Sequence, residues 1–481
     1  MALDADCFCN VTAESAFFGS SPVVQSPTPH VPVNLFDAGG ELLIDLDQVP
    51  EYMCLVSKSA LKRKEENEAD YAAGLFTPAK VNEIKKLFRF GAVEAVRIED
   101  FAGQVLDARF VLTFKPGCDG ADGAVRLFDQ RLARPRARFV VRGFQEHVNP
   151  LEDMSSPTPL WSSIRLVALQ AANHGCSLSV SDVASAFLQS DPITEQIAVP
   201  APPEAGLPPG WLLRCVNNLC GRCSAPRAWH EKLARHLVDV LGFERSLADP
   251  CSFKLKADGS LLVVHVDDLS WATLSPAMEQ AMRQLKEDFK FSETTTDNVE
   301  YCGVRIVNDT SVGEVTFSLA HYIRSCTSEV AVDESQPPSS VESEVRSSLG
   351  MSQYVASMVR PDIACSTSAL SGVVTDLRWD DVKTLNKLVR HAHHTADAVH
   401  KLTKMDMASA AVMAFSDAAF RNMPGEKSQG GHLVYLRDDN GAVNLLDWSS
   451  ARLVRRVRCT FTAELSQVMT MSDDTLVLKQ L

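Results

Sequence analysis

The strongest constraint on the fold is a pair of apolar strand patterns that end at two adjacent carboxylates. Residues 253–256 and 261–265 predict a β-hairpin across Asp258-Gly259. A second turn, which holds Asp267 and Asp268, then leads into another short strand. Adjacent carboxylates at the end of buried strands repel each other and are costly to remove from water. This turn must therefore either stay solvated or face a cation.

A third carboxylate follows a strand pattern earlier in the chain. Residues 177–183 alternate apolar and polar side chains, which predicts a half-buried strand that ends near Asp182. Mg²⁺ prefers carboxylate oxygens, and two such ions about 3.5–4 Å apart can clamp the attacking and leaving oxygens of phosphoryl transfer. Asp182, Asp267 and Asp268 are therefore candidate ligands of a metal pair. A solvated Asp-Asp turn beside an unrelated surface aspartate is the alternative that these residues leave open.

Length and composition limit the classes of protein to which the chain can belong. A domain takes roughly 100–200 residues, so 481 residues predict two to four domains. With 45% hydrophobic and 22% charged residues, the chain is not a disordered, collagen-like or coiled-coil protein. The net charge of -14 argues against a protein that coats nucleic acid non-specifically, although a local basic groove is still compatible with it.

The distribution of cysteine and apolar residues indicates a cellular location. The 13 cysteines are scattered and odd in number, which predicts reduced thiols and not a disulfide framework. The N-terminal residues lack the pattern of a signal peptide, and no apolar run is long enough to span a membrane. We expect a soluble intracellular protein without a membrane partner. The sequence leaves the oligomeric state open.

Helical patterns surround these strands. Residues 162–174 predict a helix that Gly175 stops, residues 226–241 predict an amphipathic helix, and Ser275-Pro276 predicts the cap of a further helix. The apolar face of the second helix is expected to hold Trp229, Leu233, Leu237, Val240 and Leu241.

The last third of the chain changes in character. Residues 328–346 are acidic and contain Ser and Pro, which predicts a linker, and a helical region follows to about residue 404. Residues 411–481 start as a strand, form a hairpin at 438–441 and end in a helical pattern from about residue 462.

Several motifs, in the same order, resemble those of the reverse transcriptases of copia-type LTR retrotransposons. The resemblance covers about residues 108–370, and its clearest motifs are Arg136-Ala-Arg-Phe-Val-Val-Arg-Gly-Phe144, Asp182-Val-Ala-Ser-Ala-Phe-Leu188, Leu219-Cys-Gly-Arg-Cys-Ser-Ala-Pro-Arg-Ala-Trp229, His265-Val-Asp-Asp268 and Tyr301-Cys-Gly-Val-Arg-Ile306. In the family the last two motifs are Tyr-Val-Asp-Asp and Phe-Leu-Gly-Ile-Glu-Ile. This chain therefore has His265 in place of the family tyrosine.

The resemblance implies an α+β fold. It would be a right-hand polymerase with fingers, a ferredoxin-like palm and a thumb, followed by a partial ribonuclease H-like α/β domain. The expected divisions are an N-terminal, partly disordered leader, the fingers and palm, a linker with a helical thumb or connection, and the truncated ribonuclease H-like domain. They cover residues 1–70, 71–327, 328–405 and 406–481.

The activity implied by the resemblance is RNA-directed DNA polymerisation, in which a dNTP is joined to the 3′-hydroxyl of a DNA primer on an RNA template. Asp182, Asp267 and Asp268 would hold two Mg²⁺ ions, with Mn²⁺ as an alternative. By the same resemblance, nucleotide or template contacts would come from Arg136, Arg138, Arg142, Phe187 and Gly221.

Each of these contact residues also has a plainer interpretation. The arginines could form a solvated strand face, Phe187 a core aromatic and Gly221 a simple turn. The family tyrosine and glutamine near the nucleotide site are replaced by Cys220 and Ser224. The alternative function is therefore a catalytically silent remnant of the polymerase fold that binds only nucleic acid or a partner.

The tail resembles the start of the ribonuclease H domain that follows the polymerase in these polyproteins. The motifs are Ala414-Phe-Ser-Asp-Ala-Ala-Phe420, Trp448-Ser449-Ser450 and Thr462-Ala-Glu-Leu465. They imply that Asp417 and Glu464 are metal ligands. The next family ligand belongs to a later strand, and Asp473 lies about 14 Å beyond Glu464 along a helix with a rise of 1.5 Å per residue. We expect this unit to be truncated and inactive.

Overall fold

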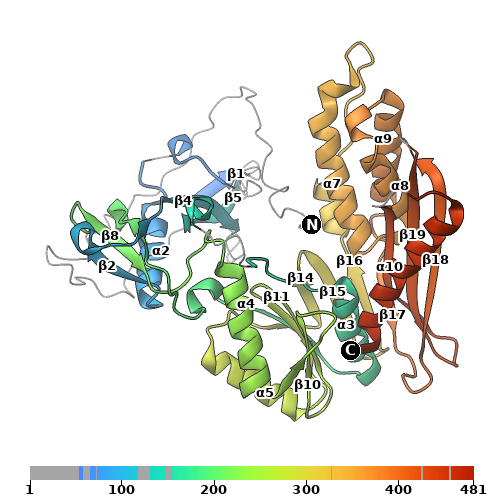
Figure 1. Ribbon diagram of the computed structural model, residues 1–481, viewed down its shortest axis with the longest axis horizontal. Helices are drawn as coiled ribbons and strands as arrows, with labels where there is room; N and C mark the ends of the chain where they lie inside the picture. The colour runs from blue at the N-terminus through green and yellow to red at the C-terminus, as the bar shows by residue number, and fades with distance from the viewer. Residues whose placement is uncertain are drawn as a thin grey trace. The chain divides into compact units, whose positions relative to one another are not determined.

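The computed structural model describes a mixture of helices and strands, as the α+β expectation requires (Figure 1). The described residues are 54–57, 65–71, 73–116, 130–147, 153–326, 328–423, 426–453 and 457–480. Most of the leader expected over residues 1–70 lies outside these residues. None of the helices in the described part combines the length and apolar character that crossing a bilayer requires.

The chain forms two compact units that interleave along the sequence. The first unit includes Pro157–Ala184 and Ala234–Leu481, and the second includes Glu14–Ser156 and Ser185–Leu233. Asp182, Asp267 and Asp268 belong to the first unit, whereas the five predicted nucleotide-contact residues belong to the second. The four segments expected along the sequence are a different division, and their boundaries stay predictions.

The second unit contains two sheets and one long helix. Its three-stranded sheet has the order β1-β5-β4, and its four-stranded sheet has the order β2-β8-β7-β3. The helix α2 (Thr77–Arg89) buries Val81, Ile84 and Leu87 in the same apolar cluster as Phe139 of β5. The strands are β1 (Cys54–Ser57), β2 (Val93–Arg97), β3 (Gln104–Val105), β4 (Ala108–Pro116), β5 (Gln130–Val141), β7 (Ile197–Pro200) and β8 (Trp211–Cys215).

The first unit is built on a six-stranded sheet, which we call the central sheet. Its order is β13-β6-β12-β11-β10-β9. The predicted hairpin is confirmed, since β10 (Ser252–Leu255) and β11 (Leu261–His265) pair antiparallel, as do β11 and β12 (Asp268–Ala272). The other strands are β6 (Leu178–Asp182), β9 (Phe243–Arg245) and β13 (Thr295–Thr296).

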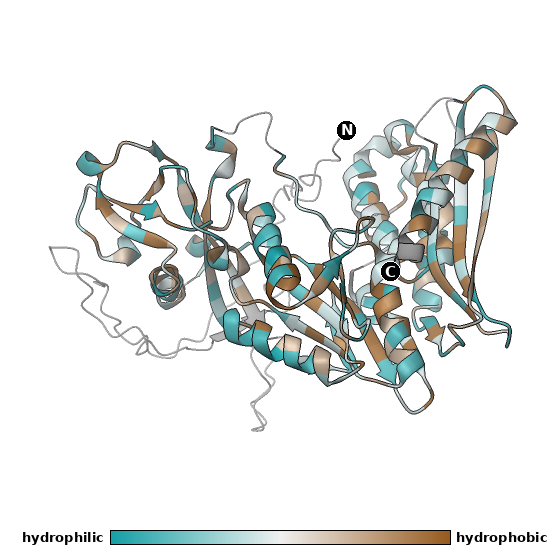
Figure 2. Ribbon diagram, turned by 60° about the horizontal axis from the view of Figure 1, so that its bottom comes forward, coloured by the Kyte–Doolittle hydropathy of each residue, from teal (hydrophilic) through white to brown (hydrophobic). Residues whose placement is uncertain are grey.

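Two helices of the first unit begin close to where the sequence predicts. The helix α3 (Trp161–His174) ends at Gly175, which adopts the left-handed conformation. The helix α5 (Pro276–Asp288) is capped by Ser275, whose side chain accepts a hydrogen bond from the amide of Ala277. Figure 2 shows hydrophilic and hydrophobic residues on the same helices, as expected where one face packs on a sheet.

Two sequence predictions about burial are wrong. The strand β6 is not half-buried, since Ser179 and Ser181 are only 4% and 2% exposed, and the Ser181 hydroxyl donates to the Ser292 carbonyl at 3.4 Å. In the predicted helix over residues 226–241, α4 (Ala225–Arg235) passes into a π-helix at His236–Val240. The wider turn changes the register, so Val240 is 53% exposed while Trp229, Leu233 and Leu237 are buried.

A second, four-stranded sheet follows the central sheet in the order β14-β15-β16-β17. It comprises β14 (Asn298–Tyr301), β15 (Val304–Asp309), β16 (Glu314–Ser318) and β17 (His400–Thr403). In the described residues, four α-helices connect β16 to β17: α6 (Ala320–Cys326), α7 (Glu342–Met358), α8 (Pro361–Ser371) and α9 (Trp379–His394). The linker predicted over 328–346 is therefore too long, because α7 begins at Glu342, and the residues just before 404 form a strand.

The C-terminal sheet has three antiparallel strands, β18 (Ala411–Met423), β19 (Lys427–Arg437) and β20 (Val443–Arg452), followed by α10 (Thr460–Gln480). The predicted hairpin at 438–441 joins β19 to β20, which confirms that prediction. On one face Trp448 donates a hydrogen bond to the Ala356 carbonyl of α7 at 2.8 Å, and α10 covers the other face.

Candidate functional site

Strand register brings the three predicted carboxylates to one end of the central sheet. In the β6–β12 pair Asp268 lies directly opposite Asp182, and in the β11–β12 pair it lies opposite His265. The amide of Val183 donates to the Asp267 carbonyl at 2.7 Å, which ties the turn to the end of β6. Directly opposed residues have Cβ atoms about 4.5–5.5 Å apart, so the three carboxylates form one cluster.

The turn between β11 and β12 has an unusual backbone. Val266 has φ of 57°, in the left-handed region that a β-branched residue rarely adopts. The pairing of β12 with strands on both sides holds this conformation in place. Such local strain is common where a chain must aim side chains at a site.

Asp268 is costly to ionise where it lies in the cluster. Burial raises its pKa to about 6, and the nearby Asp267, Asp182 and Glu300 contribute in the same direction. Among the described residues no basic side chain opposes this shift. A half-buried group of carboxylate oxygens without a cationic partner for Asp268 fits a hard divalent cation such as Mg²⁺. Glu300 of β14 was not predicted as part of the site, because its place depends on how two sheets meet.

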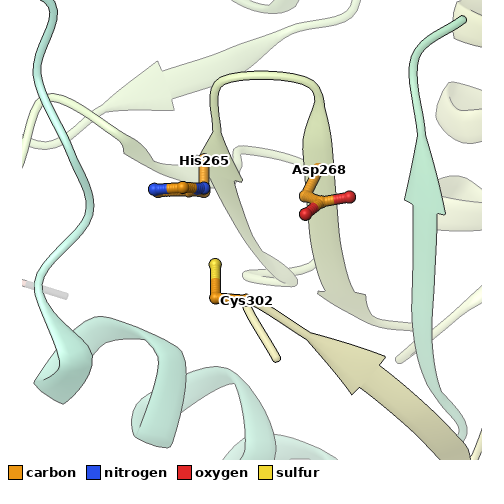
Figure 3. Close-up of side chains that lie close together, drawn as sticks. All are labelled: His265, Asp268 and Cys302. Carbon is orange, nitrogen blue, oxygen red and sulfur yellow. The ribbon is translucent and has the colours of Figure 1, made fainter. Parts of the chain in front are cut away.

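His265 and Cys302 complete the immediate surroundings of Asp268 (Figure 3). One ligand atom from each of these three half-buried side chains lies within 4.8 Å of the other two. Burial lowers the pKa of His265, and the charge of Asp267 opposes this only in part. Burial and the charges of Asp268 and Asp267 raise the pKa of Cys302 to about 12.

The arginines predicted to contact nucleotide or template lie in the second unit. Arg136 and Arg138 are two positions apart on β5 and so share a face, opposite Thr113 and Val111 of β4. Arg138 and Arg142 are exposed, and Arg142 lies 3.6 Å from Asp107. An exposed basic strand face is compatible with a phosphate contact and with simple solvation.

Phe187 and Gly221 also lie in the second unit. Phe187 belongs to a short 3-10 helix, Ala186–Gln189, and is half-buried. Gly221 has φ of +91°, and a Cβ there would lie 2.2 Å from the Val141 carbonyl oxygen. The backbone contact of this turn with β5 therefore requires glycine, whether or not a nucleotide also approaches it.

The structure does not bring Asp417 and Glu464 together. Asp417 is exposed on β18, opposite Gly431 of β19. The helix α10, which carries Glu464, covers the other face, because its Gln467 amide lies 3.1 Å from Nδ1 of His432. Neighbouring residues of a strand point to opposite faces, so Asp417 points away from α10.

A different cluster occupies the face of the C-terminal sheet under α10. Nε2 of His432 lies 3.2 Å from Asp447 and 3.3 Å from Asp474. Burial and the charge of Asp447 raise the pKa of Asp474 to about 6, while His432 opposes this shift. None of these three residues was predicted from the sequence, since their contact depends on the side of the sheet that α10 covers.

Comparison with known proteins identifies one part of the chain. Residues 126–339 match the family model described as reverse transcriptase (RNA-dependent DNA polymerase). No curated protein matches the chain.

Solved structures give weaker similarities. A foamy viral protease-reverse transcriptase dRH in complex with double-stranded DNA is 13% identical with a TM-score of 0.45, over 86% of this chain and 62% of that chain. A foamy viral protease-reverse transcriptase in complex with an RNA/DNA hybrid is 12% identical with a TM-score of 0.49, over 86% of this chain and 48% of that chain. This chain thus spans less than two thirds of either protein, and at TM-scores below 0.5 these similarities do not define its fold.

The family match includes all three predicted carboxylates as well as His265 and Cys302. The chain thus carries a reverse transcriptase (RNA-dependent DNA polymerase) domain over residues 126–339.

Proposed function

We propose that the chain is an RNA-directed DNA polymerase of the copia type, which extends a DNA primer on an RNA template with dNTPs. The observation that carries this proposal is the register of β6, β11 and β12, which gathers Asp182, Asp267 and Asp268 at one sheet end. The family match over residues 126–339 supports the same activity.

The three aspartates would hold two Mg²⁺ ions, or Mn²⁺ in their place. When bound, the ions supply charge neutralisation and Lewis acidity for attack of the primer 3′-hydroxyl on a dNTP. Asp182 and Asp268 start from paired strands, so their positions are rigid. Asp267 reaches the cluster from the turn. The electrostatic cost of Asp268 is relieved when a cation binds beside it.

The residues of the second unit have the roles that the family resemblance implies. Arg136, Arg138 and Arg142 would contact the triphosphate or the template backbone, for which guanidinium groups are well suited. Phe187 would crowd the sugar 2′ position and so select deoxynucleotides. Gly221 would allow close approach of a nucleotide in addition to its contact with β5.

Primer extension on an RNA template, with dNTPs and Mg²⁺ or Mn²⁺, tests the proposal. We expect the wild type to extend the primer and the Asp267→Asn/Asp268→Asn double variant to lose extension. Asp333→Asn is the matched control, because Asp333 is an exposed loop residue of the same unit. Extension by the double variant at the wild-type rate would refute the metal assignment.

A catalytically silent polymerase-fold remnant is the second candidate. It is favoured by His265 and Cys302, which replace family residues beside Asp268, and by the separation of Asp417 from the helix of Glu464. For the latter reason we propose that the tail does not hydrolyse RNA. A folded wild type that binds an RNA/DNA hybrid equally well with and without Mg²⁺, and never extends it, would establish this second candidate.

A further inference from the structure

The cluster of His265, Asp268 and Cys302 has a donor set unlike that of the candidate magnesium centre. It offers an imidazole nitrogen, a carboxylate oxygen and a sulfur, all within 4.8 Å of one another. Nitrogen and sulfur are characteristic zinc ligands, whereas Mg²⁺ takes oxygen ligands. With metal–ligand bonds of about 2.0–2.3 Å, side-chain shifts of about 1 Å would place these atoms at three corners of a tetrahedron.

Two separate parts of the fold hold the backbone at these three positions. His265 and Asp268 are a directly opposed pair at the tip of the β11–β12 hairpin. Cys302 is in the turn after β14 with φ of 49°, and the Tyr354 hydroxyl donates to its carbonyl at 2.6 Å. In Figure 3 the Cys302 sulfur points towards the space below the hairpin tip, between the other two side chains. Ligands held in advance in this way lower the cost of ordering a site.

We propose that His265, Asp268 and Cys302 form a zinc site that overlaps the candidate magnesium centre, so that Zn²⁺ and the catalytic ions compete for Asp268. Zinc binding converts the Cys302 thiol to a thiolate, and the proton passes to solvent. A water would complete the tetrahedron as the fourth ligand. The inhibitory consequence rests on the proposed polymerase function, but zinc binding does not.

The sulfur ligand distinguishes this site from the other group of metal-ligating side chains in the described residues. That group, His432, Asp447 and Asp474, contains no sulfur. A cobalt–thiolate absorption band in the near ultraviolet would therefore report the Cys302 site and not the other group. Cys365 is exposed on α8 and belongs to neither group, which makes Cys365→Ser a matched control.

The first experiment titrates the reduced full chain with Co²⁺ and then displaces it with Zn²⁺. We expect one equivalent of Co²⁺ to produce a thiolate band in the wild type and in Cys365→Ser. The band should vanish in Cys302→Ser, which changes only the ligand atom, and weaken in His265→Phe. Absence of the band in the wild type, or its persistence in Cys302→Ser, would overturn the proposal.

A second measurement does not depend on the spectrum or on the folding of a variant. Zn²⁺ should slow alkylation of Cys302 in the wild type at least ten-fold, as seen by mass spectrometry of the labelled peptide, and should leave Cys365 unaffected. Equal protection of both cysteines, or of neither, would contradict a specific site.

The consequence for activity is tested by primer extension at fixed Mg²⁺. The Zn²⁺ concentration that halves extension should rise at least ten-fold in Cys302→Leu, and an unchanged value would contradict competition at this site. If the wild type binds Co²⁺ through Cys302 but extends no primer, the zinc site stands and only the polymerase function fails.

Discussion

The central sheet and the C-terminal sheet both contain motifs with predicted metal ligands, but only the central sheet brings its predicted ligands together. Asp182 and Asp268 lie on adjacent strands, where register alone makes them direct neighbours. Asp417 lies on a strand and Glu464 on a helix, and α10 covers the face away from Asp417. A ligand set on paired strands is determined by local pairing, whereas a set divided between a strand and a helix also depends on which face the helix covers.

The largest expected effect comes from comparing one aspartate of the central sheet with one of the C-terminal sheet in primer extension. We expect Asp182→Asn to lower primer extension at least about 100-fold, because it removes a charge that faces the reacting groups. Asp417→Asn should leave primer extension within a factor of two of the wild-type rate, because Asp417 is an exposed residue of another sheet. Both variants are measured under the same Mg²⁺ conditions. Equal losses in the two variants would mean that the tail takes part in the polymerase reaction.

A second prediction concerns Arg165, whose side chain connects α3 to the C-terminal sheet. Arg165 of α3 is 1% exposed, donates to the carbonyls of Leu446 at 2.8 Å and Met358 at 3.0 Å, and stacks 3.8 Å from the Trp448 ring centroid. Replacing it by methionine leaves buried carbonyls unpaired, so we expect a loss of about 2–4 kcal/mol in the free energy of unfolding.

Urea denaturation of Arg165→Met followed by two optical probes tests this prediction. The matched control is Arg324→Met, since Arg324 is an exposed residue of the same unit. If Arg165→Met unfolds at the wild-type midpoint, the C-terminal sheet does not depend on this contact.

Two titratable groups, the buried His400 and the half-buried Asp474, should make the stability of the protein depend on pH with opposite signs. Burial, together with the nearby Arg165, lowers the pKa of His400 to about 3. Below about pH 6.5 His400 is protonated in the unfolded chain but stays neutral in the folded chain. Folding stability is therefore lost as pH falls from 6.5 towards 3. The raised pKa of Asp474 acts oppositely, because its contribution is full below about pH 3.8 and is lost as pH rises through 6.

When the pH is lowered from 7 to 5, the free energy of unfolding should fall by about 1–2 kcal/mol less in His400→Gln than in the wild type. For the same fall in pH, the free energy of unfolding should decrease more in Asp474→Asn than in the wild type. Urea midpoints at the two pH values measure both differences. A His400→Gln variant with the wild-type pH slope would show that His400 is not held neutral by the fold.

The smallest expected effect concerns Glu300, the carboxylate that adds to the charge around Asp268. Glu300→Gln removes one negative charge beside the candidate metal centre, which at a half-solvated site corresponds to about a two- to five-fold rise in the Mg²⁺ concentration for half-maximal extension. The maximal rate should change less than this concentration. A large fall in rate at saturating Mg²⁺ would instead make Glu300 a direct ligand.

Local patterns in the sequence were sufficient to predict much of the secondary structure of the first unit. The helix that ends at Gly175, the hairpin around Asp258-Gly259 and the cap at Ser275 all depend on residues within one element or one turn. Burial was harder to predict. The serines of β6 imply an exposed face, yet Ser179 and Ser181 are buried, and a π-helix turns Val240 away from its expected face.

The sequence by itself determined that three carboxylates end adjacent strand patterns and that a reverse transcriptase-like series of motifs surrounds them. Only the tertiary structure decided that Glu300, His265 and Cys302 lie beside Asp268, and that Asp417 faces away from α10. The physical reason is the range of the interactions. Periodicity and turn chemistry act over a few residues, whereas the meeting of two sheets and the side on which a helix packs depend on burial across the whole unit.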